Sequence, residues 1–390
     1  MIAIKLAIKN LIGAGLRTIL NVFILSVAFV VIIMQNGLIQ GWNKQARHDA
    51  EKWEYARGQY RQLSYDPYDV FTLEEAHAAI PSELMEARNS GDVAPILITQ
   101  ATIYPEGRLK SVLLKGIDPG QKTLSLPTDK LAGPPEAIPA ILGSRMAMSI
   151  KANVGDYLMV RWRDANGTFD ATEVYIADIF STTVPSMDLA QIWIPISNLQ
   201  SMMGLEDEAT LIAVKDDNLA GMELPDWKFM SLDELLTPMD EMIKGKSVGN
   251  AILSAILLAL ALLAIFDTQV LSIFRRQKEI GTFIAMGMTR RQVISIFTVE
   301  GTMHAISALV MGAIWGTPLL IWFKKTGMPM PEGVDQMGLP VTESIIPAYS
   351  IGLVMISVCV VTITTAIVSY MPARKIARMN PNDAIRGKIQ

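Results

Sequence analysis

Four apolar runs, each close to or above the length of a membrane-spanning helix, constrain this chain more than any other feature. They extend over Ile19–Ile39, Ala251–Phe274, Thr302–Phe323 and Ile345–Met371. An α-helix needs about 20 apolar residues to cross a bilayer. Hydrophobic residues make up 51% of the 390-residue chain, and they are bunched in these runs. We therefore predict an integral membrane protein with transmembrane helices at 18–40, 247–274, 300–323 and 345–371.

The first run follows a basic start, as the core of a secretory signal peptide does. It is longer than a typical signal core, and no small-x-small cleavage site follows it, so we predict a retained anchor. Before it, Ile4, Ile8 and Leu11 recur at helical spacing beside Lys5 and Lys9. This pattern predicts that residues 1–17 form an amphipathic helix on the cytoplasmic face of the membrane.

The distribution of charge predicts the orientation. Thirteen basic residues lie in the head (1–17), the central loop (275–299) and the tail (372–390). Residues 41–246 hold 19 basic and 31 acidic residues, a net charge of −12. By the positive-inside rule, both termini and the central loop are cytoplasmic, and 41–246 and the loop 324–344 are outside. Lys324 and Lys325, at the outer end of the third span, are an exception to the rule.

Residues 41–246 are predicted to form a large extracytoplasmic α+β domain, inserted between the first and second transmembrane helices. Alternating apolar and polar residues predict the strands. These strands are 94–102, 109–117, 157–163, 168–180, 191–195 and 210–215. Helices are expected at 73–88 and 144–151, and Asn166-Gly167 indicates a type I′ hairpin turn rather than a glycosylation site. The single cysteine, Cys359, excludes an intrachain disulfide, so this domain depends on its own core.

Aromatic and methionine residues near the spans are candidate substrate contacts. Trp53, Tyr55 and Tyr60 follow the first span closely. Aromatic side chains there usually mark the membrane interface, and the alternative is that they grip an acyl chain. Met328 and Met330 lie in the outer loop, where flexible thioethers suit an adaptable apolar contact. The alternative for this loop is a plain connector.

The loop at 275–299 is too charged for hydrocarbon but keeps an apolar stripe at helical spacing. The stripe consists of Ile280, Phe283, Ile284 and Met288. It predicts a short amphipathic helix that is presented to a partner protein. The alternative is an ordinary cytoplasmic loop that holds the positive-inside charges.

Polar residues within or at the ends of the spans are functional candidates by default. Asp267 and Gln269 lie about two turns before Arg275. Glu300 and His304 begin the third span and form an i, i+4 pair. A structural role in helix contacts is the alternative for all four side chains. In the same span Gly312 and Gly316 are four apart, a spacing that points weakly to a dimer interface.

Motifs for catalysis are missing from the sequence. The segment Gly245-Lys246-Ser247 fails as a phosphate-binding loop because Asp240 stands where the motif requires its first glycine. The sequence contains no His-Glu-x-x-His, no Cys/His cluster and no Gly-x-Ser-x-Gly elbow. We therefore expect a non-catalytic chain that itself holds no cofactor and no metal, and we expect no nucleic-acid partner.

Two segments on the predicted cytoplasmic side carry motifs. The central loop contains Arg276-Gln277-Lys278-Glu279-Ile280-Gly281 followed by Ala285-Met286-Gly287-Met288, and the tail runs from Pro372 to Arg386. Both resemble the coupling and closing motifs of the FtsX/MacB/LolC/LolE-type permeases of ABC transporters. Segments 115–119, 142–147, 154–156 and 188–195 are also similar to that family. One span, a large outer domain and three further spans is the layout of these permeases. Asp267 departs from relatives, which commonly have asparagine there.

The resemblance implies a permease without a fused ATPase, in the bacterial inner membrane. Its implied partners are a dimer of ABC ATPase subunits, which bind ATP and magnesium, and a second permease copy, identical or paralogous. Membrane lipids and a periplasmic carrier or outer-membrane partner are further implied contacts. Contact with the ATPase is implied for Arg276, Lys278, Glu279, Ile280, Gly281, Phe283, Ala285, Gly287, Arg290 and Arg291.

The implied mechanism is mechanotransmission: ATP-driven closure of the ATPase tilts the spans, and the outer domains act on a lipoprotein, lipid or other amphiphile. Two alternatives stay open. The chain could be a non-transporting regulator of a cell-wall hydrolase, as within the same family. It could also be a membrane-anchored receptor that binds a ligand without nucleotide.

Overall fold

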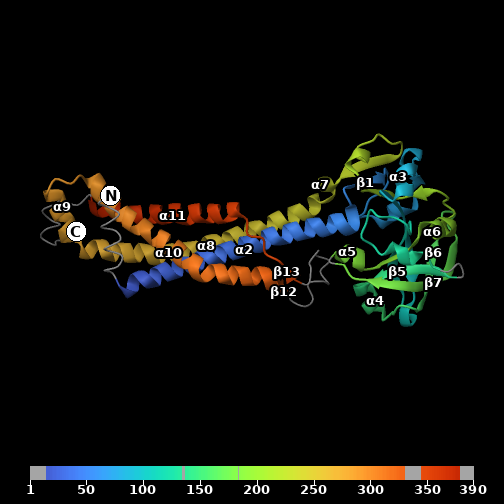
Figure 1. Cartoon of the computed structure of the whole chain (residues 1–390), viewed down its shortest axis with the longest axis horizontal. Coiled ribbons are helices and arrows are strands. Elements are labelled where there is room, and N and C mark those ends of the chain that lie inside the picture. The colour runs from blue at the N-terminus through green and yellow to red at the C-terminus, as the bar shows by residue number, and fades with distance from the viewer. Residues whose placement is uncertain (1–14, 134–136, 183, 330–343, 378–390) are drawn as a thin grey trace. The chain divides into compact units, whose positions relative to one another are not determined.

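The computed structural model describes residues 15–133, 137–182, 184–329 and 344–377. The chain divides into two compact units (Figure 1). Of the described residues, the helical unit comprises 15–43, 242–328 and 345–377, and the sheet unit comprises 44–133, 137–182, 184–241, 329 and 344. The predicted amphipathic helix at 1–17 lies almost wholly outside the described residues, as does the tail beyond Ala377.

Among the described residues, four helices are long and apolar enough to cross a membrane, as predicted. They are α2 (Leu16–Ala50), α8 (Thr237–Arg275), α10 (Arg290–Thr326) and α11 (Ile351–Ala377). The short helix α9 (Gln277–Ala285) joins α8 to α10, and the two-residue strands β12 (Met328–Pro329) and β13 (Ser344–Ile345) lie between α10 and α11 in the chain. The predicted central loop is therefore helical over most of its length.

The helix bounds differ from the predicted spans. Helix α2 continues past residue 40 to Ala50, followed by a π-helical turn, η1 (Glu51–Tyr55). Helix α11 begins at Ile351 rather than at residue 345, because Pro347 has no N–H to donate and the N–H of Ala348 donates to the carbonyl oxygen of Gly37 at 2.9 Å. The preceding Ser350 caps α11: its Oγ accepts from the N–H of Leu353 at 3.2 Å.

An apolar cluster among the four long helices holds the helical unit together. Its buried members are Val22, Leu25, Ala28, Phe29, Ile32, Ile33, Leu258, Ala261, Ile265, Ala305, Ala308, Leu353 and Val361. Gly312 and Gly316 of α10 face α2 in this packing, and a Cβ at Gly316 would lie 2.4 Å from Cγ2 of Val30. The two glycines are thus used within one chain. The prediction that they mark a dimer interface is wrong.

The sheet unit is built on nine strands in the order β11-β1-β10-β3-β4-β8-β5-β7-β6, and a further pairing of β3 with β6 closes six of them into a ring. The strands are β1 (Gly58–Gln62), β3 (Val93–Ile103), β4 (Lys110–Ile117), β5 (Ile138–Gly143), β6 (Tyr157–Arg163), β7 (Phe169–Phe180), β8 (Gln191–Pro195), β10 (Leu211–Val214) and β11 (Trp227–Ser231). The parallel pairs β4–β8 and β5–β7 interrupt an otherwise antiparallel pattern. The structure thus has the predicted mixture of strands and short helices.

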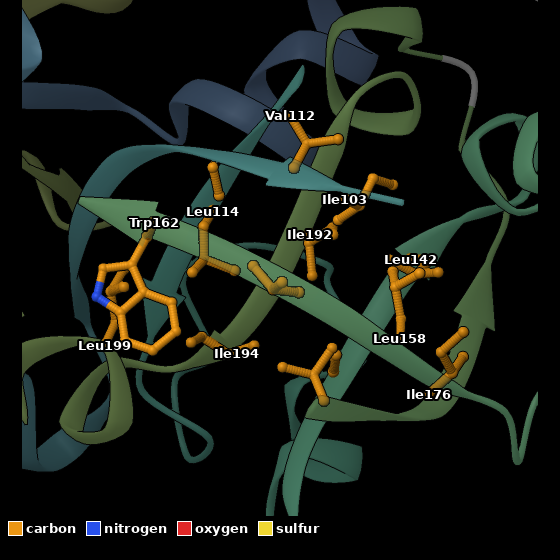
Figure 2. Close-up of a cluster of buried hydrophobic side chains, with 14 of the residues drawn as sticks. Ile103, Val112, Leu114, Leu142, Leu158, Trp162, Ile176, Ile192, Ile194 and Leu199 are labelled. Atoms are coloured by element: carbon orange, nitrogen blue, oxygen red, sulfur yellow. The ribbon is translucent and has the colours of Figure 1, made fainter. Parts of the chain in front are cut away.

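Buried side chains from the strands of the ring form the larger core of this unit (Figure 2). Leu114, Leu142, Ile176 and Ile192 are completely buried, and Leu199 of α6 (Ile196–Met203) packs with them. Smaller elements surround the sheet. They are η2 (Val70–Glu74), β2 (Ala78–Ala79), η3 (Ser82–Leu84), α3 (Met85–Ser90), η4 (Pro105–Gly107), η5 (Thr128–Leu131), α4 (Ser144–Ile150), α5 (Pro185–Asp188), β9 (Glu208–Ala209), η6 (Asp217–Leu219) and α7 (Leu232–Leu235).

Two local predictions are wrong. The helix expected at 73–88 is replaced by η2, β2, η3 and only the six residues of α3, since Pro81 interrupts the segment and Ala78 pairs with Ala209. The Asn166-Gly167 hairpin exists, but its turn is not type I′, which needs positive φ at both central residues. Only Gly167 has positive φ (+85°), and Oδ1 of Asp164 accepts from the N–H groups of Asn166 and Thr168.

Asp188 connects two of the segments that resemble the permease family, 142–147 and 188–195. Its side chain is fully buried, and Oδ1 accepts from the N–H of Arg145 at 3.0 Å while Oδ2 accepts from Nη1 of Arg145 at 2.9 Å. Burial raises the pKa of the Asp188 carboxyl, and these hydrogen bonds oppose the rise. A Cβ at Gly143 would lie 1.9 Å from Oδ1 of Asp188, so only glycine fits there. Segments 142–147 and 188–195 are therefore linked through a buried ion pair.

Candidate functional site

The predicted apolar stripe of α9 faces the chain's own helices. Ile280 is 2% exposed and packs in a cluster with Ile273 of α8, Phe297 of α10 and Ala373 of α11. Phe283, Ile284 and Met288 are partly buried against the same cluster. For Ile280 the prediction that the stripe is presented to a partner is wrong, because apolar side chains from α8, α10 and α11 already cover it, whereas Phe283, Ile284 and Met288 stay partly exposed. The cluster instead fixes α9 to all three helices.

Arg276, immediately before α9, adds a polar link to α10. Its Nη1 lies 3.0 Å from Oε2 of Glu300, and its Nε lies 2.9 Å from Oε2 of Glu279. The guanidinium also lies over the ring of Phe297, 5.2 Å from the centroid. The Glu300 side chain is 7% exposed and the Glu279 side chain 56%, so the first contact is a buried ion pair and the second a surface one. Arg276 therefore anchors α9 within the chain.

The opposite face of α9 is open. Lys278, Glu279, Thr282, Ala285 and Met286 are exposed, and Met286 is the most exposed large apolar side chain of this region at 69%. Gly287, also exposed, ends the helix with a φ of +96°, a conformation that glycine adopts without strain. Arg290 and Arg291 are exposed at the start of α10, whereas Gly281 is buried. Of the residues for which the resemblance implies contact with an ATPase, the exposed ones are Lys278, Glu279, Ala285, Gly287, Arg290 and Arg291.

The polar residues predicted within the spans separate into two groups. Gln269, Glu300 and His304 are buried, while Asp267 is exposed and does not join them. The Glu300–His304 side-chain pair is not formed as expected, because the carboxylate of Glu300 binds Arg276. Nδ1 of His304 contacts the main-chain carbonyl oxygen of Glu300 at 3.1 Å. Of these three buried groups, Glu300 bonds outside its own helix, to Arg276, whereas the printed hydrogen bond of His304 stays within α10.

Close helix approach beside this site depends on Gly301, which was not selected as a candidate from the sequence. A Cβ at Gly301 would lie 2.0 Å from Oγ of Ser369 on α11 and 3.4 Å from Nε2 of Gln269 on α8. Three helices thus meet at one glycine, one residue after Glu300. The relevant signal was the adjacent pair Glu300-Gly301, but its partners are distant in the sequence.

The substrate-contact candidates do not form one site. Tyr60 is fully buried, and its hydroxyl donates to the carbonyl oxygen of Leu219 at 2.6 Å and accepts from the N–H of Met222 at 2.8 Å. The prediction that Tyr60 contacts a substrate is therefore wrong. Trp53 stacks on Phe180 with ring centroids 6.0 Å apart, Tyr55 is half-buried, and Met328 is 40% exposed. Met330 lies outside the described residues.

The region that contains α9 and most of α8, α10 and α11 matches a known family. Residues 251–381 match the FtsX-like permease C-terminal family. This part of the chain is similar to the FtsX-like permease C-terminal domain. The resemblance to FtsX/MacB/LolC-type permeases of ABC transporters is thereby confirmed, and α9 with its Arg276–Glu300 anchor lies inside the FtsX-like permease domain.

Curated relatives are distant but consistent with this family. The chain is 21% identical over 342 residues to the lipoprotein-releasing system transmembrane protein LolC of Xylella fastidiosa, which covers 79% of this chain and 80% of that one. It is 25% identical to the macrolide export ATP-binding/permease protein MacB of Wolinella succinogenes over 40% of this chain and 22% of that one. It is 21% identical to an ABC transporter permease of Methanocaldococcus jannaschii over 42% of this chain. The chain spans only 38% of that last permease.

Among solved structures, the extracellular domain of the ABC-type transporter YknZ aligns with 41% of this chain and 82% of its own length, at 15% identity and a TM-score of 0.26. A TM-score this low does not establish a shared fold.

Proposed function

We propose that this chain is the permease subunit of an ABC transporter, and that α9 is the element on which the ATPase subunits act. The observation that supports this best is the two-sided character of α9. One face is fixed to α8, α10 and α11 by an apolar cluster and the buried Arg276–Glu300 pair, and the other face is open. Because packed interiors deform little, a displacement of α9 is passed to all three helices.

In this proposal two ATPase subunits, which bind ATP and magnesium, close beneath α9 and tilt the long helices. Helix α8 is continuous for 39 residues, which at 1.5 Å per residue is roughly 58 Å. The sheet unit then works on the outer side of a bacterial inner membrane, on a lipoprotein, lipid or other amphiphile. Two permease copies act together, in contact with membrane lipids and with a periplasmic carrier or outer-membrane partner.

Met286→Asp tests the docking face. The side chain is 69% exposed, so the substitution leaves the chain's own packing intact. An unpaired charge buried in a docked contact is costly, and a loss of about 3 kcal/mol would weaken binding more than 100-fold. We expect the ATPase subunit to be lost from affinity-purified chain at unchanged expression and membrane insertion. Phe283→Asp is less suitable because Phe283 packs in the chain's own cluster.

Ser295→Asp is the matched control for this experiment. Ser295 is exposed on α10, outside α9, and receives the same charge. We expect this variant to retain the ATPase. Normal recovery of the ATPase with Met286→Asp would remove the open face of α9 from the interface.

A further inference from the structure

A cavity of about 350 Å³ lies within the sheet unit. Six neighbouring strands each contribute to one wall: β11, β1, β10, β3, β4 and β8 supply Met230, Arg61, Leu211, Ile96, Lys115 and Trp193. The lining also includes three tyrosines, at positions 55, 65 and 68. Small-molecule sites are clefts of this kind, mostly apolar and aromatic with a few polar groups, and the volume is at the lower end of their range. The cavity suits a small molecule rather than a folded protein.

Lys115 is the unusual member of this wall. It is 9% exposed and lies between Leu113 and Ile117 on a strand face that packs into an apolar cluster. Its ammonium lies over the ring of Trp193, its register neighbour on β8, 5.0 Å from the centroid. Among the residues that the structure describes, no carboxylate forms an ion pair with it and no acceptor hydrogen-bonds to it. A buried lysine without a paired anion costs stability, so a chain that keeps one carries a group available to a ligand.

The surroundings of Lys115 indicate what that ligand carries. Burial lowers the pKa of Lys115 to about 8. The negative charge of Glu54 raises this pKa, and the positive charge of Arg61 lowers it further. An anion beside the ammonium would favour its charged form and so offset the free-energy cost of burying that charge. The indole Nε1 of Trp193 is a second buried donor without an acceptor among the described residues. Glu234, the other carboxylate of the cavity, already accepts from the N–H of Ser231 at 2.9 Å.

We propose that this cavity binds a small anionic molecule with an apolar or aromatic body, and that its acid group pairs with Lys115. Tyr55, Tyr65 and Trp193 supply aromatic surface for the body, and Ile96 and Leu211 supply aliphatic surface. All of these residues belong to the sheet unit, so the site does not depend on the coupling role proposed for α9.

Calorimetric titration of the purified full chain tests this site with three soluble probes of one shape. They are 4-phenylbutyrate, its neutral amide and 4-phenylbutylamine. We expect the acid to bind at least ten-fold more tightly than the amide, and the amine not to bind. Dihexanoyl phosphatidate, a short-chain lipid, shows whether the acid group of the natural ligand belongs to a lipid headgroup or to a free acid. If this lipid binds more tightly than 4-phenylbutyrate, the ligand is a lipid. If it binds more weakly, the ligand is a free acid. Equal binding of acid, amide and amine, or no binding of either acid, would overturn the proposal.

Lys115→Met and Lys110→Met form the matched pair of variants. Both lysines are on β4, but on opposite faces. Nζ of Lys110 donates to Oγ of Ser149 at 2.6 Å, and neither residue lines the cavity. Lys115→Met should abolish acid binding and raise the Tm of the ligand-free chain by at least about 2 °C, because a buried unpaired charge is removed. Lys110→Met should leave binding unchanged. A lower Tm for Lys115→Met would show that Trp193 and Glu54 already offset the burial of the ammonium in the ligand-free chain, which contradicts the proposal.

Discussion

Gly301→Val is expected to destabilise the helical unit by about 3 kcal/mol or more, because it overpacks a site where helices already touch. The first added carbon would lie 2.0 Å from Oγ and 2.3 Å from Cβ of Ser369. Ser369 is completely buried on α11, so its side chain has no space into which to move. Relief requires α10 and α11 to separate, which also disturbs Gln269 of α8. Thermal unfolding of the purified chain measures the effect.

Gly352→Val is the control for this substitution. Gly352 lies in α11, and a Cβ there would meet nothing within 4 Å. The two variants add the same side chain to long helices of the same unit. We expect a small effect at Gly352. Equal unfolding temperatures for the two variants would mean that α10 and α11 do not approach each other as described.

Glu300→Ala is expected to cost about 3–5 kcal/mol, because it removes the buried carboxylate and leaves the Arg276 guanidinium with only the exposed carboxylate of Glu279. The Arg276 side chain is only 18% exposed and is held over Phe297. With the anchor lost, α9 should loosen from α10, and ATP hydrolysis by the partner subunits should no longer respond to the permease. Denaturant unfolding of the isolated chain measures the first effect, and ATPase stimulation in the assembled complex measures the second.

Glu279→Ala provides the comparison, since it removes the other carboxylate that contacts the same arginine. Glu279 is 56% exposed, and exposed ion pairs contribute only about 0–1 kcal/mol. Its effect on unfolding of the isolated chain should therefore be small. If the two glutamates proved equivalent in unfolding, the buried pair would not be what holds α9.

The helices could be predicted well from the sequence because the bilayer imposes a length and a composition on each span. Some strands were also predictable: β6, which alternates, and β8, which is buried throughout, have the expected bounds, 157–163 and 191–195. By contrast, β1, β5 and β11 were missed: β1 and β11 have a weak pattern, and β5 directly follows a proline-rich segment. Pro347, which moves the start of α11, lies inside an apolar run and therefore left the hydropathy signal intact.

The direction of the α9 stripe could not be predicted for a physical reason. Periodicity shows that one face of a helix is apolar, but it does not show what covers that face. Ile280 is covered by Phe297 and Ala373, which are separated from it in the sequence and brought close only by packing. Lys115 illustrates the same limit, because both its strand and the strand of Trp193 were predicted, while the pairing that brings the two side chains together was not.

Thiol labelling from one side of the membrane tests the central claim, that α9 and the sheet unit face opposite compartments. The chain has one cysteine, so Cys359→Ala creates a background without thiols. Met148→Cys on α4 and Met286→Cys on α9 then place single thiols at positions that are 71% and 69% exposed. With a membrane-impermeant maleimide on intact cells, Met148→Cys should be labelled at once and Met286→Cys only after the membrane is opened. Labelling of both positions from the same side would contradict transmission across the membrane.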